Sequence, residues 1–367
     1  MTPADVIVVG GGIAGISAAA EIAGDGARVT VLEGEAQLGY HSTGRSAAIF
    51  IRNYGNATLR ALNAAAEQVF ETPGEIAGSS LLSPRGELLL ATDEEMTALE
   101  SYIEGAEGVD RLSTGEAVEL VPILRPEHIG GAVIERGARD IDVDRALQGY
   151  ARLLKARGGR IVTGAAVSGI SRSGDIWEVT TDKEVHAAPV LINAAGAWAD
   201  DIARLAGVGT VGLRPMRRSA ALLPAPDGHD ISTWPLFGSV SETWYAKPDA
   251  GRLMVSPADE DPVDPHDAWA DDMVLAEGLY RYEQAVTVPV TRVESNWAGL
   301  RSFTWDRTPV AGFDPSADGF FWLAGQGGYG VQTAPALARL CSALVSGREP
   351  ALAPLAVLAL SPSRFSP

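Results

Sequence analysis

Three glycines near the start of the chain have the spacing of a dinucleotide-binding turn. Gly10, Gly12 and Gly15 follow a short run of β-branched residues and begin an alanine-rich stretch. In such a turn the first glycine permits the tight bend, the second lets a pyrophosphate approach the backbone, and the third lets the helix pack on the strand. Glu33 ends the next apolar run, where its carboxylate would accept hydrogen bonds from an adenosine ribose. The pattern predicts a dinucleotide site.

A second glycine cluster, residues 325–330, lies between an apolar run and an alanine-rich stretch near the other end of the chain. The N-terminus of a helix at this point would carry a partial positive charge, which stabilises negative charge at the N1/O2 end of a reduced flavin. A second turn of this kind therefore favours FAD over a nicotinamide cofactor. An ordinary turn whose glycines only relieve backbone strain is the alternative that the pattern leaves open.

The composition argues against several other classes of protein. The 367 residues include 47 acidic and 29 basic ones, and the net charge of -18 opposes binding to nucleic acid or to an anionic membrane. Cys341 is the only cysteine and the 5 histidines lack ligand spacing, so we expect no disulfide framework, iron–sulfur cluster or other metal site. The apolar stretch 6–23 is interrupted by glycines and by Glu21. We therefore expect a cytoplasmic protein without a signal peptide or transmembrane segment.

Periodicity and turn residues predict the elements that position these glycines. Helices are predicted over residues 13–23, 58–70, 93–105, 143–156 and 331–344, with Asp142 as the N-cap of the fourth. Strands are predicted over residues 5–9, 28–32, 83–92, 160–162, 177–181, 185–188, 190–193, 252–255 and 320–324. Residues 39–55 are predicted to form a long loop, and such loops in compact domains usually have a function.

Five segments along the chain occur together in one known family. They are residues 10–15 with Glu33, the loop 41–48, and the segments 193–198, 297–302 and 325–333. Together they resemble the FAD-dependent D-amino-acid oxidase family, and most closely its bacterial D-arginine dehydrogenase members. The resemblance implies an α/β fold with α+β elements: an interrupted Rossmann-type domain that binds FAD noncovalently, and a smaller mixed-sheet domain that binds substrate. It assigns residues 1–79, 139–207 and 302–367 to the FAD-binding domain, and residues 80–138 and 208–301 to the substrate-binding domain.

The resemblance also implies which residues surround the cofactor. They come from both glycine clusters, from the long loop and from the segment after the strand at 190–193. The expected FAD-binding residues are Gly10, Gly12, Ile13, Ala14, Gly15, Glu33, Ser42, Thr43, Arg45, Ser46, Ala47, Val167, Ala195, Gly196, Trp198, Gly327, Gly328, Tyr329, Gly330, Val331, Gln332 and Thr333.

Arg301 and Arg218 match the family's clamp for the carboxylate of the substrate, a task that suits the planar, permanently charged guanidinium. Tyr245 and Tyr54 match tyrosines that line the substrate, and the Gly328 carbonyl is the expected acceptor for the substrate amine. Outside the resemblance, a surface arginine and a tyrosine of the core are the commoner roles of these residue types. Arg301 departs from that rule because its segment is apolar and aromatic.

The implied reaction is the oxidative deamination of a D-amino acid to a 2-oxo acid and ammonia, by hydride transfer from the substrate α-carbon to flavin N5. Two alternatives stay open. The same fold could oxidise a secondary amine of the sarcosine or D-proline type, or a 2-hydroxy acid, and the chain could be a flavin-binding subunit without catalysis. The electron acceptor is also open, as a quinone, another carrier or O2; with a quinone, the protein would work at the membrane periphery.

Substrate specificity is expected to depend on Glu87, which matches the family carboxylate that pairs with a cationic side chain. The alternative for Glu87 is an exposed strand carboxylate. Ile49, Ile51 and Arg52 replace the polar lid of D-arginine dehydrogenases, and an apolar lid favours apolar side chains by about 25 cal/mol per Å² buried. An ion pair between Arg52 and Glu87 would remove the preference for a basic substrate. Gln332 matches a position beside the flavin and the substrate.

Overall fold

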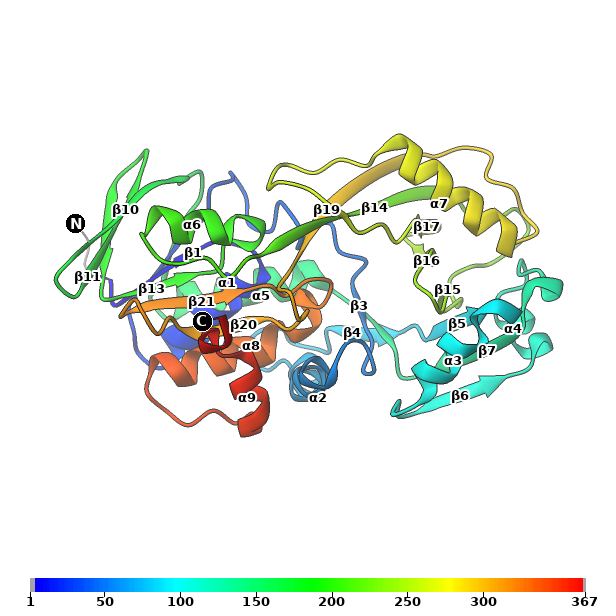
Figure 1. Cartoon of the computed structure of the whole chain (residues 1–367), viewed down its shortest axis with the longest axis horizontal. Coiled ribbons are helices and arrows are strands. Elements are labelled where there is room, and N and C mark those ends of the chain that lie inside the picture. Colours follow the sequence, from blue (N-terminus) through cyan, green and yellow to red (C-terminus); the bar gives the residue numbers. More distant parts are fainter. Residues whose placement is uncertain (1–3, 366–367) are drawn as a thin grey trace.

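Two large β-sheets lie at opposite ends of the computed structural model, which describes residues 4–365 (Figure 1). The first sheet has six strands in the order β20-β21-β13-β1-β2-β9. Its neighbouring strands are parallel, except that β20 runs antiparallel to β21. The six strands are β1 (Val6–Val9), β2 (Val29–Leu32), β9 (Arg160–Val162), β13 (Val190–Asn193), β20 (Val310–Phe313) and β21 (Phe320–Ala324).

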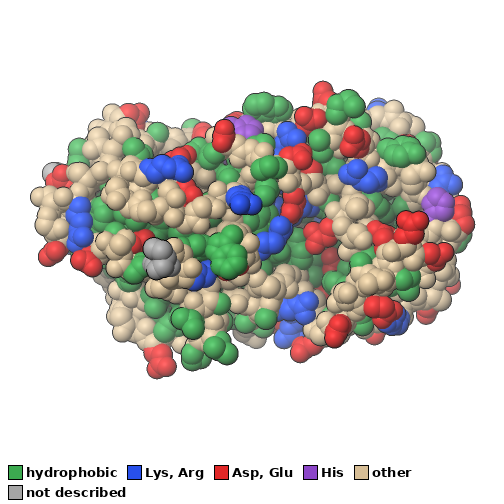
Figure 2. Space-filling view, in the orientation of Figure 1, with side chains coloured by type: hydrophobic (Ala, Val, Ile, Leu, Met, Phe, Trp, Pro, Cys, Tyr) green, Lys and Arg blue, Asp and Glu red, His purple; other side chains and the backbone are tan. Residues whose placement is uncertain are grey.

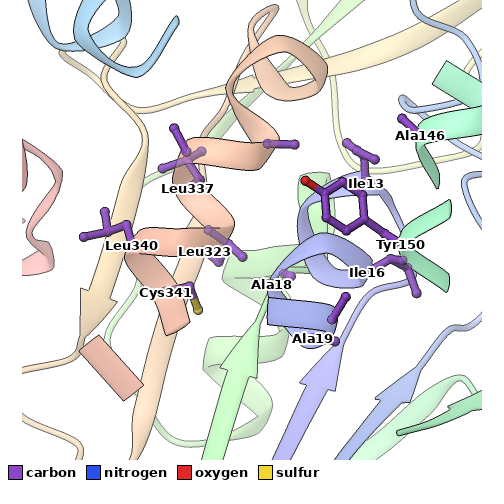
Figure 3. Packing of buried hydrophobic residues seen from close by; sticks show 14 of the residues in the cluster. Ile13, Ile16, Ala18, Ala19, Ala146, Tyr150, Leu323, Leu337, Leu340 and Cys341 are labelled. Atoms are coloured by element: carbon purple, nitrogen blue, oxygen red, sulfur yellow. The ribbon is translucent and has the colours of Figure 1, made fainter. Parts of the chain in front are cut away.

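Helices cover one face of this sheet. α1 (Ile13–Gly24) packs against both α5 (Val143–Ala156) and α8 (Gly330–Val345), and α2 (Ala57–Glu71) packs against α8. Figure 3 shows the side chains of α1 between Tyr150 of α5 and Leu337 of α8. Because β1 and β21 are parallel members of one sheet, their carboxyl ends meet at one edge, and the N-termini of α1 and α8 start there together.

The other face is covered by a three-stranded antiparallel sheet and a short helix. These elements are β10 (Val167–Ser173), β11 (Ile176–Thr181), β12 (Val185–Ala188) and α6 (Ala199–Leu205), which follows the 3-10 turn Gly196–Trp198. Ile7 and Val9 of β1 pack on this side with Trp177 and Ile202, while Val6 and Val8 pack against the helices. Burial on both faces explains why the central strands are continuous apolar runs in the sequence.

The second large sheet has nine strands and is mixed. Its strands β5 and β15 pair in parallel, and all other pairings of the sheet are antiparallel. Its strands are β5 (Glu87–Ala91), β6 (Val109–Leu112), β7 (Gly131–Glu135), β14 (Arg214–Pro224), β15 (Leu236–Ser239), β16 (Tyr245–Asp249), β17 (Arg252–Ser256), β18 (Asp261–Pro262) and β19 (Ser295–Phe303). The helices α3 (Met96–Ile103), α4 (Thr114–Leu120) and α7 (Asp272–Ala285) pack on it. The paired strands β14 and β19 run from the middle of the molecule into this half (Figure 1).

A small fourth sheet lies between the two halves and joins β3 (Ile49–Phe50), β8 (Arg139–Ile141) and β4 (Leu82–Pro84). The remaining elements are α9 (Pro354–Leu360) and the 3-10 turns Asp93–Glu95, Pro126–His128 and Pro362–Phe365. None of the helices in the described part of the chain combines the length and the apolar character that a bilayer crossing requires. Acidic and basic side chains are interspersed over the face of the molecule in Figure 2.

The predicted fold class is confirmed, as are most of the predicted elements. The helix at 143–156 begins with the predicted cap, because the Asp142 carboxylate accepts a hydrogen bond from the Arg145 N–H at 3.0 Å. The single strand predicted over 83–92 is wrong. Gly86, with a φ of +81°, divides this segment into β4 of the small sheet and β5 of the large one. The two large sheets draw almost all of their strands from the two predicted domains, and we propose those residue ranges as the domain limits.

Candidate active site

The first glycine turn is held by close backbone packing at the carboxyl end of β1. Gly10 has a φ of +113°, and a Cβ atom there would lie 2.3 Å from the Ala194 carbonyl oxygen. A Cβ atom at Gly15 would lie 2.0 Å from the Gly10 carbonyl oxygen. Gly12 is the N-cap of α1 and provides no side-chain cap. The first turn of α1 therefore presents backbone N–H groups to an anion, as a pyrophosphate site requires.

Glu33 is fixed beside this turn at the end of β2. Its carboxylate accepts hydrogen bonds from the Gly11 N–H at 2.6 Å and the Glu35 N–H at 2.8 Å. The carboxylate lies in the wall of a first cavity of about 420 Å³. Other expected FAD-binding residues in this wall are Gly10, Gly12, Ile13, Ala14, Ser42, Thr43, Val167, Ala195, Gly196, Trp198, Gly327 and Gly330.

A second, smaller cavity of about 90 Å³ adjoins the first, since Ile13, Ser42, Thr43, Gly327 and Gly330 line both. Arg45, Ser46, Ala47, Gly328 and Val331 also line the second cavity. The N-cap of α8, like that of α1, makes no side-chain cap hydrogen bond. Two open helix N-termini and a carboxylate along a continuous space form a donor and acceptor set that fits FAD.

A third cavity of about 240 Å³ continues from the second, and the two share Arg218, Tyr245, Arg301 and Gly328. This third cavity lies between the two large sheets, because its wall includes residues of the second glycine turn as well as residues of the nine-stranded sheet. The expected substrate residues Ile49, Ile51, Tyr54 and Glu87 also line it, as does Tyr329. The structure thus brings the predicted clamp, the tyrosines and the specificity residues Ile49, Ile51, Glu87 and Gly328 to one space beside the predicted flavin site.

Arg301 and Arg60 line this cavity without a carboxylate partner in the described residues, but the Arg60 guanidinium donates to the Gly55 and Gly105 carbonyls at 3.1 and 2.7 Å. Within residues 4–365, the only side-chain hydrogen bond of Arg301 runs from Nη1 to the Tyr54 hydroxyl at 3.5 Å, and no ion pair joins Arg301 to a carboxylate. Burial lowers the pKa of Arg301, but Tyr54, Tyr245 and Glu242 outweigh burial and keep it above its ordinary value. A Cβ atom at position 328 would lie 2.8 Å from Arg301 Nη1, so Gly328 leaves room for the guanidinium.

The two tyrosines respond differently to this environment. Burial raises the pKa of Tyr245, but the Arg301 and Arg218 guanidiniums and the Ser256 hydroxyl outweigh burial and hold it below the ordinary value. Burial raises the pKa of Tyr54 well above its usual range. The Tyr54 ring packs on Tyr329 with ring centroids 4.5 Å apart. The Tyr54 phenol is therefore protonated at neutral pH and can donate a hydrogen bond to an anion.

Arg218 lines the same cavity but already has a counter-ion. Its Nη2 donates to the Glu260 carboxylate at 3.0 Å, and Glu260 also accepts hydrogen bonds from Arg307 at 2.8 and 3.0 Å. The Arg218 side chain is buried and its Nε has no partner within the described residues. Arg301 is therefore the stronger candidate for an incoming carboxylate, with Arg218 as its auxiliary.

Glu87 is buried at the start of β5, and its carboxyl accepts a hydrogen bond from the Tyr102 hydroxyl at 3.3 Å. Burial and the adjacent Glu135 raise the pKa of Glu87 to about 8. The ion pair with Arg52 that would neutralise Glu87 is absent from the described structure. The Arg52 side chain is exposed, its Nε lies 3.6 Å from Glu67, and it lines a separate cavity of about 370 Å³. The assignment of Arg52 to the substrate lid is therefore wrong.

Three of the expected FAD-binding residues do not line any of the three cavities. Gln332 is buried behind the lid, where it accepts a hydrogen bond from the Ile51 N–H at 3.1 Å and donates one to Asn63 at 2.8 Å. The Thr333 hydroxyl donates to the Tyr329 carbonyl within α8 at 2.8 Å. Gly15 acts through close packing against Gly10. These three residues contact other parts of the protein and not the cavities: Gln332 and Thr333 through their hydrogen bonds, and Gly15 through its close packing.

Four residues of the site were missed by the sequence interpretation. Asn53, Tyr102 and Glu242 line the third cavity, and Glu135 contacts it through Tyr102. Glu242 has a φ of +52° in the turn before β16. None of these residues carries a local motif, and the pairing of Glu135 with Glu87 depends on the strand register. The motif and the spacing could not have identified them.

Comparisons with known proteins agree with this arrangement. A family model described as FAD dependent oxidoreductase (DAO) matches residues 5–344. FAD-dependent oxidoreductase domain-containing protein 1 of Bos taurus is 27% identical over 400 residues, covering 93% of this chain and 81% of that protein. Glycine oxidase of Geobacillus kaustophilus is 26% identical over 376 residues, covering 96% of each.

Solved structures show the same fold. L-proline dehydrogenase from P. horikoshii superimposes with a TM-score of 0.85 at 23% identity, covering 99% of this chain and 98% of that one. The glycine oxidase from Geobacillus kaustophilus superimposes with a TM-score of 0.83 at 24% identity, covering 98% of both chains. The likeness spans both halves of the molecule, so it includes the sheet that carries the third cavity.

Proposed function

The chain belongs to the DAO family of FAD-dependent oxidoreductases, and from this premise we propose that it oxidises a D-amino acid to the corresponding 2-oxo acid and ammonia. Its broader class, an FAD-dependent oxidoreductase of amines or amino acids, follows from the family. FAD supplies the two-electron oxidant of the reaction when it is bound. The residues around the first and second cavities are the ones that would hold it.

The observation that carries the proposal is the cationic Arg301 without a carboxylate partner at the third cavity. A charged guanidinium in an enclosed site is expensive without an anion, so the site favours a substrate that brings one. The planar guanidinium binds a carboxylate through two parallel hydrogen bonds. Tyr245 and Tyr54 would add hydroxyl donors, and Arg218 would add a second positive charge beside them.

The remaining polar groups suit the amine and the side chain of an amino acid. Gly328 lies in the walls of both the second and the third cavity, so its carbonyl is the acceptor that we propose for the substrate amine. A carboxylate held at one end and an amine held at the other fix the orientation of the α-carbon. The side chain would then extend toward Ile49, Ile51 and Glu87 in the same cavity.

A secondary amine is the second candidate. The superimposable L-proline dehydrogenase is named for a substrate that carries the same carboxylate and a secondary amine. The clamp at Arg301 would bind either type of substrate, since it contacts only the carboxylate. The D configuration is what the resemblance implies, so the comparison of enantiomers belongs in the first test.

The test is to add candidate donors to the purified holoenzyme under anaerobic conditions. The loss of the flavin absorbance measures its reduction. We expect bleaching with D-lysine, D-arginine, D-norleucine or D-phenylalanine and none with their L-enantiomers. Bleaching by sarcosine, D-proline or L-proline identifies the second candidate, and bleaching by D-lactate identifies a 2-hydroxy acid as the substrate. Retention of FAD without bleaching by any of these donors would contradict both enzyme proposals and leave the flavin-binding subunit. Admission of air after bleaching then measures whether O2 accepts the electrons.

A further inference from the structure

Glu87, in the wall of the third cavity, and Glu135, in the wall of the cavity that Arg52 lines, form a pair of buried carboxyl groups. They lie directly opposite each other in the antiparallel pairing of β5 and β7, and they are 7% and 3% exposed. The Tyr102 hydroxyl of α3 lies 3.3 Å from a Glu87 carboxyl oxygen and 3.4 Å from a Glu135 carboxyl oxygen. No Lys, Arg or His side chain of the described chain forms an ion pair with either carboxyl.

The hydrogen bonds around the pair differ on its two sides. Glu135 accepts from the Arg52 N–H at 2.8 Å and from Asn53 Nδ2 at 2.6 Å, besides the shared Tyr102 hydroxyl. Glu87 has only the shared hydroxyl, and one hydroxyl hydrogen serves one acceptor at a time. Donors stabilise the charged form of a carboxyl group. Glu135 is therefore the carboxyl group with the better set of donors, and Glu87 is the one whose charged form has the least support.

We propose that Glu87 and Glu135 act as one proton-sharing acid pair, and that a cationic substrate side chain enters this site by replacing the proton. The inference rests on the proposed function, because it takes an amino acid as the ligand. In the exchange, the O–H bond of the Glu87 carboxyl breaks, its proton passes to solvent, and the carboxylate pairs with the ammonium or guanidinium of the substrate. A neutral side chain leaves the proton in place.

The charged and titratable groups around Glu87 support this exchange. Glu135 faces it from β7, Tyr102 from α3, and Glu242 from the turn before β16. Burial raises the pKa of Glu87 to about 8, and the charges of Glu135 and Glu242 add to this effect while Tyr102 opposes it. The charges of Glu135 and Glu242 attract a cation that replaces the proton, whereas Arg60, Arg218 and Arg301 also line the third cavity, and Arg52, Arg136 and Arg139 line a cavity with Glu135.

The exchange makes the choice of side chain depend on pH. Below pH 8, a basic substrate must displace a proton, so its affinity relative to a neutral substrate falls by about tenfold per pH unit. Above that pH, Glu87 is already ionised and the relative affinity no longer changes. The α-ammonium of the substrate titrates too, but it does so equally in a basic and a neutral amino acid, so the ratio of the two affinities isolates the pair.

Calorimetry on D-lysine and D-norleucine tests the exchange, because the two side chains have equal length and differ in the terminal ammonium. Anaerobic holoenzyme that has first been reduced with dithionite binds them without turnover. Titrations at pH 6.5 in buffers of different ionisation enthalpy give the number of protons released. We expect D-lysine to release about one proton more than D-norleucine. Equal proton release by the two ligands would overturn the proposal.

Two variants extend the test. Glu87→Gln imitates the protonated carboxyl, so we expect the affinity of D-lysine to fall relative to that of D-norleucine, and the extra proton release by D-lysine to disappear. Glu135→Gln removes the charge that holds the proton, so the extra proton release at pH 6.5 should shrink. Glu127→Gln, a change at an exposed carboxylate, serves as the control. Tight binding of D-lysine by Glu87→Gln would contradict the assignment.

Infrared spectroscopy of the holoenzyme without substrate separates this inference from the proposed function. A protonated carboxylic acid has a C=O stretch distinct from that of a carboxylate. We expect such a band at neutral pH, its loss above pH 8, and its absence in Glu87→Gln but not in Glu127→Gln. Without such a band the acid pair is refuted even if amino acids bind. With the band but without binding of any amino acid, the pair stands and the proposed substrate is wrong.

Discussion

At the scale of single residues, the site is defined by which charges have partners. Arg301 has no carboxylate partner in the described chain, whereas Arg218 is paired with Glu260. Glu87 has no cation, and its neighbour Glu135 is held by donors from the lid. The cavity therefore combines Arg301, a cation without a carboxylate partner, with the buried carboxyl group of Glu87, and under the proposed function these two groups would bind the two ends of an amino acid with a long side chain.

Replacement of Arg301 tests the cationic end. Arg301→Met removes the two charge-assisted hydrogen bonds to the substrate carboxylate, which are worth about 3 kcal/mol, so we expect kcat/KM to fall by about a hundredfold or more. The FAD content, read from the flavin absorbance after gel filtration, should not change. Arg292→Met is the control, since that side chain is 69% exposed and pairs only with Glu294. Unchanged kcat/KM in Arg301→Met would contradict the clamp.

The acid pair also predicts how stability depends on pH. The folded pKa of Glu87 is raised to about 8 from an ordinary value of 4.5. Between these values the folded protein holds a proton that the unfolded chain has lost, so the stability contributed by this group falls as pH rises and levels off above pH 8. The Glu87→Gln variant lacks this pH-dependent loss of stability, because glutamine does not ionise. Its Tm relative to wild type should rise between pH 5.5 and 8.5, and a constant difference would refute the raised pKa.

At the scale of elements, two strand–turn–helix units place their helix N-termini at one edge of a sheet. The parallel order of β1, β13 and β21 brings the turns after β1 and β21 together, although they are more than three hundred positions apart in the sequence. Close contacts then require glycine at particular positions. At Gly327, which has a φ of +53°, a Cβ atom would lie 2.1 Å from the Phe303 ring.

Substitution of Gly327 tests whether the second turn serves the flavin. Gly327→Ala forces either the Phe303 ring or the turn to move, so we expect a weaker affinity for FAD, by about tenfold or more, and a blocked reconstitution of the holoenzyme. Gly174→Ala is the matched control, because Gly174 has a φ of +59° and nothing lies within 4 Å of its Cβ direction. FAD titration by fluorescence quenching measures both variants. Equal affinities would show that the turn lies away from FAD.

At the scale of the whole molecule, the cavities run between two sheets that are joined by the loop 39–55. Arg45 of this loop donates to the carbonyls of Ala268 and Ala298 at 2.9 and 3.0 Å, and the Ser42 hydroxyl donates to the Leu300 carbonyl at 2.6 Å. The same loop carries Thr43, whose Oγ1 accepts from the Ile13 N–H at 3.1 Å. One loop therefore connects the start of α1 with the nine-stranded sheet.

Removal of FAD tests this arrangement globally. A ligand that binds only the folded state stabilises it by about 2.7 kcal/mol when present at 100 times its dissociation constant. We expect the apoprotein to have a lower Tm than the holoenzyme, and its Tm to rise with added FAD. Riboflavin, which lacks the part that the first cavity accommodates, should raise it less. Equal stabilisation by riboflavin and FAD in scanning calorimetry would contradict a role for the first cavity.

The sequence by itself determined the first strand–turn–helix unit and the class of cofactor. The first unit consists of local features: the spacing of its glycines, the apolar strands before and after its helix, and Glu33 at the end of the second strand. The glycines specify local geometry because only glycine tolerates such backbone contacts. The helix at 143–156 and the strand at 320–324 were equally readable, since their periodicity and caps lie within the segments themselves.

Only the tertiary structure decided the substrate end of the site. The partner of Arg52, the place of Gln332 behind the lid and the pairing of Glu87 with Glu135 each depend on contacts between distant segments. A strand's register sets which carboxyl groups face each other, and the donors that reach each carboxyl group then distinguish the two. Neither quantity is encoded in the spacing of residues along one segment, so the acid pair became visible only once β5, β7 and α3 were packed together.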